Sequence, residues 1–180
     1  IFTFGGIEGQ VKAAEAQLEA DEAAALLRDA GIASSSNGCR GIDHGAWVPL
    51  RWMYPAVDVP VVQLSVQPGL GTPHHLQVGR ALQPLTERDV LVIGSGHVTH
   101  NLRDWMTSHD ATQPLPYVTA FSRWLESHLA SDDEAALLTY REQAPAAARA
   151  HPTEEHFLPL YVALGAAGSA VTSRRIYSGM

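Results

Sequence analysis

Two short apolar segments with a helix-forming segment between them constrain the fold of this chain more than any other feature. Val59 to Val66 (VPVVQLSV) and Asp89 to Gly94 (DVLVIG) are rich in β-branched residues and lie next to Pro or Gly, which is typical of strands. Between them, Thr72-Pro73 is a typical helix start, and apolar residues follow at helical spacing up to Leu82. Strand, helix and strand in this order predict an α/β fold, with a mostly parallel or mixed central sheet flanked by helices on both faces.

Helical periodicity recurs elsewhere in the chain. The predicted helices are Glu8–Ala30, ended by Gly31; Tyr117–Leu129; Asp132–Tyr140; and Thr153–Leu164, capped by Thr153 and closed by Gly165. The sequence shows no internal repeat and no long linker. It therefore predicts a single domain over residues 1–180.

Composition excludes several classes of protein. The formal net charge of −7 disfavours a nucleic acid or an anionic membrane surface as partner, and no apolar run approaches the ~20 residues of a membrane helix. The single cysteine, Cys39, excludes a disulfide framework and a thiolate-rich zinc site. No export signal is visible, so we expect a cytoplasmic protein. Eleven Arg against one Lys, with long Ala runs, favours a bacterial source.

Histidine is the residue type that points to chemistry, because imidazole is both a metal ligand and an acid–base group. The chain has nine, and one pair follows the second predicted strand in Gly94-Ser95-Gly96-His97-Val98-Thr99-His100. In open parallel sheets, loops at the carboxyl ends of strands carry reactive side chains. A tight turn with surface imidazoles explains the same residues, and both interpretations stay open. A nucleophile elbow and a phosphate loop are excluded, because Ile93 stands where the first needs Gly and no G-K-[ST] follows.

Two further segments contain candidate histidines. In AHPTEEHF (150–157), His156 would lie in the first turn of the predicted helix, where the helix dipole favours the neutral imidazole that binds metals. Asp43-His44-Gly45 is the other candidate segment. A structural alternative stays open, in which Asp43 caps a helix and His44 packs beneath Trp47. Structural roles are predicted for the remaining histidines, His74, His75, His109 and His128.

Together these segments resemble a known family. The matching segments are DHGAWVPL at 43–50, MYP at 53–55, VPVVQLS at 59–65, GSGHVTHNLR at 94–103 and AHPTEEHFLPLYVALGAAG at 150–168. In this order they resemble the class III extradiol ring-cleavage dioxygenases, in the DOPA 4,5-dioxygenase-like branch. The resemblance implies a single catalytic domain, corresponding to the central and C-terminal part of the family's fold. It also implies an enzyme that opens a catechol ring with O2 at a mononuclear non-haem metal.

The resemblance also assigns roles to residues. It implies that His156 is a metal ligand and that His100 is the acid–base catalyst or a second residue at the metal. It implies that His44 assists catalysis and lines the substrate site with Trp47. The expected metal is Fe(II), or Zn(II) in its place, and the expected partners are a small aromatic diol and O2. A homodimer is left open.

One departure from the family bears on the metal. The two N-terminal ligands, in His-Gly-Ser-Pro and Ser-Ala-His-Trp segments, are not among these 180 residues, and we expect them upstream of Ile1. Two other functions remain open at this point: a non-catalytic Memo-like binding protein on the same scaffold, and a zinc-dependent hydrolase.

Overall fold

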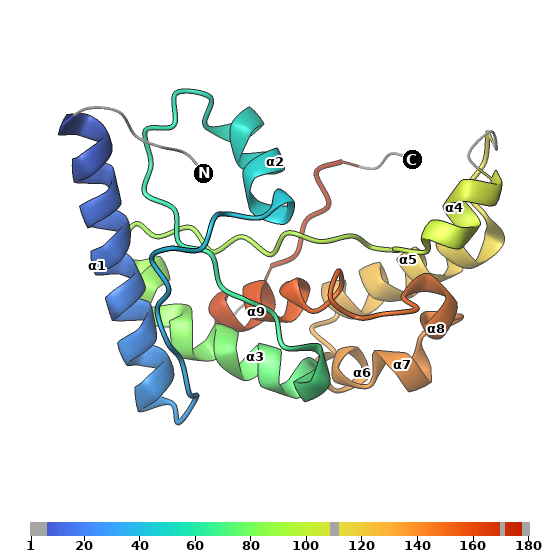
Figure 1. The fold of residues 1–180 in the computed structure, drawn as a ribbon. Helices are drawn as coiled ribbons and strands as arrows, with labels where there is room; N and C mark the ends of the chain where they lie inside the picture. The colour runs from blue at the N-terminus through green and yellow to red at the C-terminus, as the bar shows by residue number, and fades with distance from the viewer. Residues whose placement is uncertain (1–6, 109–111, 170–171, 178–180) are drawn as a thin grey trace. The chain divides into compact units, whose positions relative to one another are not determined.

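A computed structural model of the chain describes residues 7–108, 112–169 and 172–177 (Figure 1). Contacts group the chain into two compact units. The first comprises residues 1–65 and 81–91, and the second comprises residues 66–80 and 92–180. The expectation of one domain over residues 1–180 stays a prediction.

The predicted central sheet is wrong for the part of the chain that the structure describes, which contains helices and irregular segments but no strand. Residues 59–66 and 89–94 were expected to be strands of a sheet covered by helices on both faces. Instead Val62, Leu64, Leu91 and Ile93 are all exposed. A β-branched apolar run favours an extended backbone locally, whereas a sheet also needs a neighbouring strand to accept and donate hydrogen bonds. The described residues supply no such neighbour, so the local preference does not become a sheet.

The first unit is built around a long helix, α1 (Ile7–Asp29), as the sequence predicts. Leu27 of α1 is buried, and Gly31 ends the helix with a positive φ of 76°. The Ile32 N–H donates to the carbonyl of Leu27, which satisfies one of the last carbonyls of the helix. The unit also contains α2 (His44–Met53) and the 3-10 helix η2 (Gln83–Glu87).

The second unit carries most of the buried core. Its helices are η1 (Pro68–Leu70), α3 (Gly71–Leu82, whose last two residues belong to the first unit), α4 (Leu102–Ser108), α5 (Pro116–Ala130), α6 (Glu134–Leu138), α7 (Tyr140–Gln143), α8 (Ala147–Ala150) and α9 (Pro159–Ala166). Aromatic side chains dominate this core: Phe121, Tyr140, Phe157 and Tyr161 are fully buried and contact one another. The Tyr161 hydroxyl donates to the carbonyl of Leu137, which satisfies the only polar atom of that side chain.

Two glycines allow α3 and α9 to lie against each other (Figure 1). A Cβ at Gly79 would lie 2.1 Å from the carbonyl oxygen of Val162, and a Cβ at Gly165 would lie 2.3 Å from that of Leu76. Both distances are too short for real atoms. The contact therefore depends on backbone meeting backbone, and it fixes α9 on one side of the unit.

The helix predicted from Thr153 to Leu164 is wrong in its first half. Residues 152–158 form bends and turns, and α9 begins only at Pro159. Proline is favoured in the first turn of a helix, where its missing N–H is not needed. The Thr153 hydroxyl donates to Glu155 Oε1 instead of capping a helix. His156 consequently lies in the turn before α9, not in a first helical turn. Among the described residues, no helix is both long and apolar enough to cross a membrane.

Candidate functional site

Two segments of the second unit hold the histidines that the sequence singled out, and backbone hydrogen bonds join them. The N–H of His97 donates to the carbonyl of His156 at 2.9 Å, and the N–H of His100 donates to the carbonyl of Ala150 at 2.8 Å. Residues 94–100 and 150–156 are thus fixed in register although they are far apart in sequence. The structure therefore brings together the GSGHVTH and AHPTEEH motifs.

Two glycines make this close approach possible. A Cβ at Gly96 would lie 2.2 Å from the carbonyl oxygen of His156, and a Cβ at Gly94 would lie 2.5 Å from that of Pro159. Any larger residue would force the two segments apart. The glycines of the motif therefore serve to bring the histidine-bearing backbones into contact.

We expect Gly96→Ala to lower the free energy of unfolding by about 1–3 kcal/mol, because the added methyl group overpacks this backbone contact. The matched control is Gly69→Ala, since a Cβ there meets nothing within 4 Å. Its effect should stay within about 0.5 kcal/mol, as for most surface changes. Urea unfolding of the two variants tests this, and equal destabilisation would contradict the role assigned to Gly96.

The imidazole rings of three histidines gather where the segments meet. The rings of His100 and His156 stack, with centroids 3.6 Å apart and planes at 29°. The ring of His97 lies 5.4 Å from that of His100 and 5.8 Å from that of His156. His100 and His156 were predicted as site residues. His97 was named only as a member of the histidine pair in residues 94–100 and was assigned no role.

The electrostatics of this cluster favour an uncharged imidazole at His100. Burial lowers the pKa of His100, and the neighbouring His156 and His97 lower it further, because two adjacent imidazolium charges repel. Glu155 acts in the opposite direction on His100. The hydroxyl of Thr153 is the main cause of the lowered pKa of Glu155, which keeps that carboxylate ionised beside the cluster. A neutral imidazole has a free lone pair that can accept a proton or bind a metal.

A second group of polar contacts fastens the same region to α4. The Asn101 side chain accepts from the N–H of Asp104 at 3.0 Å and donates to the carbonyl of Arg149 at 2.8 Å. Arg149 in turn pairs with Asp104, Nε to Oδ2 at 2.8 Å, and lies over the ring of Tyr117. Burial and the hydrogen bond to Asp104 raise the pKa of Tyr117 to about 12. These contacts attach Asn101, the residue after His100, both to Asp104 of α4 and to Arg149 of α8.

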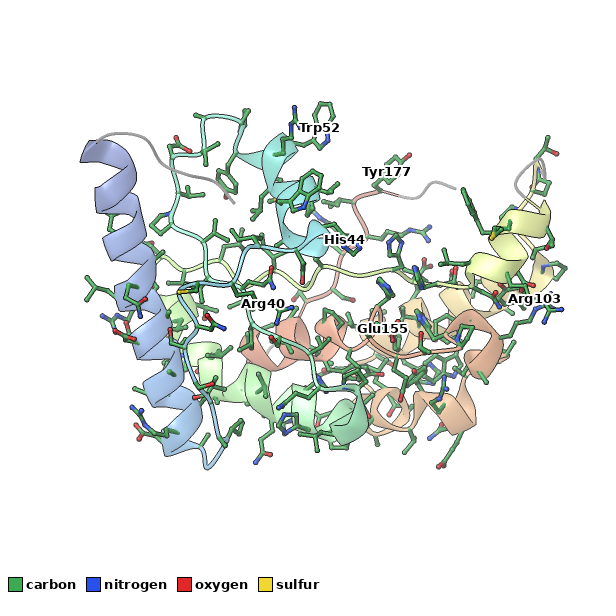
Figure 2. The ribbon with its side chains drawn as sticks, in the orientation of Figure 1. Arg40, His44, Trp52, Arg103, Glu155 and Tyr177 are labelled. Atoms are coloured by element: carbon green, nitrogen blue, oxygen red, sulfur yellow. The ribbon has the colours of Figure 1, made fainter. Side chains whose placement is uncertain are left out.

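His44, which is labelled in Figure 2, and Trp47 belong to the first unit, on α2. Asp43 directly precedes α2, in agreement with the alternative left open for it, but its carboxylate accepts from the Gln63 side chain at 3.1 Å instead of capping the helix. Trp47 is partly exposed, and Trp52 nearby is 85% exposed. The proposed roles of His44 and Trp47 remain predictions from the resemblance.

The other histidines differ from one another. His75 is buried: its Nδ1–H donates to the carbonyl of Gly71, and its Nε2 accepts from the N–H of Gln67. His74 is half-buried and contacts the Gln67 side chain, and His128 contacts the carbonyl of Trp124. His109 lies outside the described residues.

The described residues meet part of the requirement for a mononuclear metal centre. His100 and His156 place two imidazoles side by side, and the lowered pKa of His100 favours the form that binds metals. However, no group of three or more His, Cys, Asp or Glu side chains is arranged to hold a metal within the ranges that the structure describes. These residues therefore do not make a complete centre by themselves.

Comparison with known proteins shows the class of protein to which these motifs belong, the aromatic ring-opening dioxygenases. The family model described as the catalytic LigB subunit of aromatic ring-opening dioxygenase matches residues 8–180, so the chain belongs to this family. The resemblance of the five motifs to the extradiol ring-cleavage dioxygenases is therefore confirmed.

Individual relatives agree with the family. The chain is 44% identical over 154 residues to the 4,5-DOPA dioxygenase extradiol of Beta vulgaris, covering 85% of this chain and 57% of that protein. It is 47% identical over 139 residues to that of Portulaca grandiflora, covering 77% and 51%. A crystal structure of an uncharacterized protein from Escherichia coli K12 has a TM-score of 0.70 and 33% identity, covering 82% of this chain and 61% of that one. This chain thus spans about half the length of the curated relatives it matches.

Proposed function

We propose that this chain is part of an extradiol dioxygenase that opens the ring of a catechol-type substrate with O2. The observation that carries the proposal is the stacked pair of His100 and His156, held together by the two motifs of the family. The names of the relatives in Beta vulgaris and Portulaca grandiflora favour a DOPA-like diol as substrate. O2 is the second substrate.

The chemistry that this chain's own side chains would supply is proton transfer. His100 has a lowered pKa and is uncharged near neutral pH, so a ring nitrogen can accept a proton from a catechol hydroxyl. The same imidazole can return the proton later in the reaction, because an imidazole can both accept and donate a proton. Glu155, ionised beside the cluster, would stabilise the protonated ring in between.

For the metal, we propose that His156, with His100 beside it, faces an Fe(II) ion, with Zn(II) able to replace it, and that further ligands come from outside these residues. The proposal rests on the neighbouring imidazoles of the pair and on family membership. His156→Ala should therefore abolish stoichiometric iron binding in the full-length protein. A His156→Ala protein that still holds one iron per chain would refute the ligand assignment.

The activity itself is tested on the full-length protein loaded with Fe(II) under argon. On addition of DOPA and air, we expect one molecule of O2 to be consumed for each molecule of ring-opened product formed, with the product measured by its absorbance. The matched anaerobic sample should show no turnover. Turnover that is independent of O2 would indicate a hydrolase. Absence of ring opening across a series of catechols, in protein shown to be folded and iron-loaded, would overturn the proposal.

A further inference from the structure

His151 is a buried histidine that the proposed chemistry does not use. Its side chain is fully buried against aromatic rings, with centroids 4.6 Å from Phe157 and 5.6 Å from Phe121. Its Nε2 lies 2.8 Å from the carbonyl oxygen of Val98. A carbonyl can only accept, so Nε2 carries the proton and donates it. The tautomer of His151 is thereby fixed.

The other ring nitrogen makes this histidine costly to keep. Nδ1 is buried and has no hydrogen-bond partner among the residues that the structure describes. An unpaired buried acceptor is unfavourable, and an apolar side chain would fill the same aromatic surroundings without that cost. In return, His151 contributes a single hydrogen bond. Its acceptor is the carbonyl oxygen of Val98, two residues before His100.

That bond is the third in a short series between the two histidine-bearing segments. The N–H groups of His97 and His100 donate to the carbonyls of His156 and Ala150, and the His151 side chain donates in the opposite direction to Val98. Along residues 97–100 the direction of these hydrogen bonds alternates: His97 donates, Val98 accepts and His100 donates. The His151 bond orients the peptide group after Val98, between the two backbone bonds, which limits rotation of the segment that carries His100.

We propose that His151 is a positioning residue, whose Nε2–H···O bond to Val98 sets the placement of the His100 ring against the His156 ring. The inference rests on the proposed function for its catalytic meaning, but the geometry it predicts is testable without activity. It predicts that a side chain able to donate at the position of Nε2 preserves the stacked pair, and that an apolar side chain does not. His151 also holds the backbone through its own carbonyl, which accepts from Arg141, and a substitution leaves that contact available.

The test compares His151→Leu, which packs but cannot donate, with His151→Gln, whose amide nitrogen can reach the position of Nε2. His151→Asn is the second control, because its shorter side chain retains a donor that falls short of Val98. Two NMR readouts are independent of any metal. Amide exchange reports the hydrogen bonds of His97 and His100, and the ring-proton shifts of His100 and His156 report their stacking.

We expect His151→Leu and His151→Asn to speed exchange of the His97 and His100 amides by about 3- to 10-fold, the effect of losing one hydrogen bond. The ring protons should shift toward unstacked values, while the Tyr161 amide in α9 stays protected. His151→Gln should retain wild-type values in both readouts. Uniform loss of protection that includes Tyr161, or unchanged His100 and His156 resonances in His151→Leu, would overturn the proposal.

The full-length enzyme separates this inference from the proposed function. There, His151→Leu should lower kcat with KM little changed, and His151→Gln should restore kcat. If the wild-type enzyme opens no catechol ring, the proposed function fails while the NMR comparison still decides the role of His151. If ring opening proceeds at the wild-type kcat in His151→Leu, the positioning role fails and the proposed function stands.

Discussion

Replacing His100 with alanine should reduce ring-opening turnover by about 10²- to 10⁴-fold, the range that a general acid–base residue contributes. The expectation follows from its environment: His100 is uncharged near neutral pH because burial, His156 and His97 lower its pKa. Its side chain is outside the buried core, so the variant should fold. Steady-state rates with DOPA and O2 on the iron-loaded full-length protein provide the measurement.

The matched control for this variant is His74→Ala. His74 is a half-buried histidine of α3 that contacts the Gln67 side chain and does not belong to the His97–His100–His156 cluster. Its loss should leave turnover within about twofold, as expected for a surface change. Iron content distinguishes the two roles open to His100. We expect it to be retained in His100→Ala, whereas loss of the iron would make His100 primarily a ligand.

The stability of the second unit should fall as the pH is lowered from about 6.5 to about 4. Burial lowers the pKa of His151 from 6.5 to about 4. Over this range the unfolded chain binds a proton that the folded chain does not, so the free energy of unfolding decreases with falling pH. The whole shift is equivalent to about 3 kcal/mol, at up to about 1.4 kcal/mol per pH unit. Above pH 6.5 both states are neutral and His151 contributes no slope.

Urea unfolding at a series of pH values measures this slope, and His151→Leu isolates it. Burial also lowers the pKa of His75, so His75 adds to the pH dependence of the free energy of unfolding in both proteins. Carboxylates whose pKa is lowered in the folded state, such as Glu155, lose their contribution mainly below this window. The free energy of unfolding of wild type, relative to that of His151→Leu, should therefore decrease as the pH falls. A difference independent of pH would show that His151 titrates normally in the folded protein.

Local signals in the sequence predicted some of the helices well. The helices α1 and α5 were expected within a few residues of their observed bounds, and Gly31 ends α1 as predicted. These features depend on residues close in sequence, because a helix makes its hydrogen bonds four residues apart. The predicted sheet failed for the opposite reason. Residues 59–66 and 89–94 have strand-like composition, but pairing depends on neighbours that composition does not reveal.

The sequence by itself determined the family of this chain and two members of its histidine cluster, because motif residues and their order are carried by the chain. Only the tertiary structure decided that His100 and His156 stack, that His97 joins them, and that His156 lies in a turn instead of a helix. Those facts depend on hydrogen bonds between residues about fifty positions apart and on the backbone contact at Gly96. Such contacts form only when the folded chain brings distant segments together, so no spacing within one segment could reveal them.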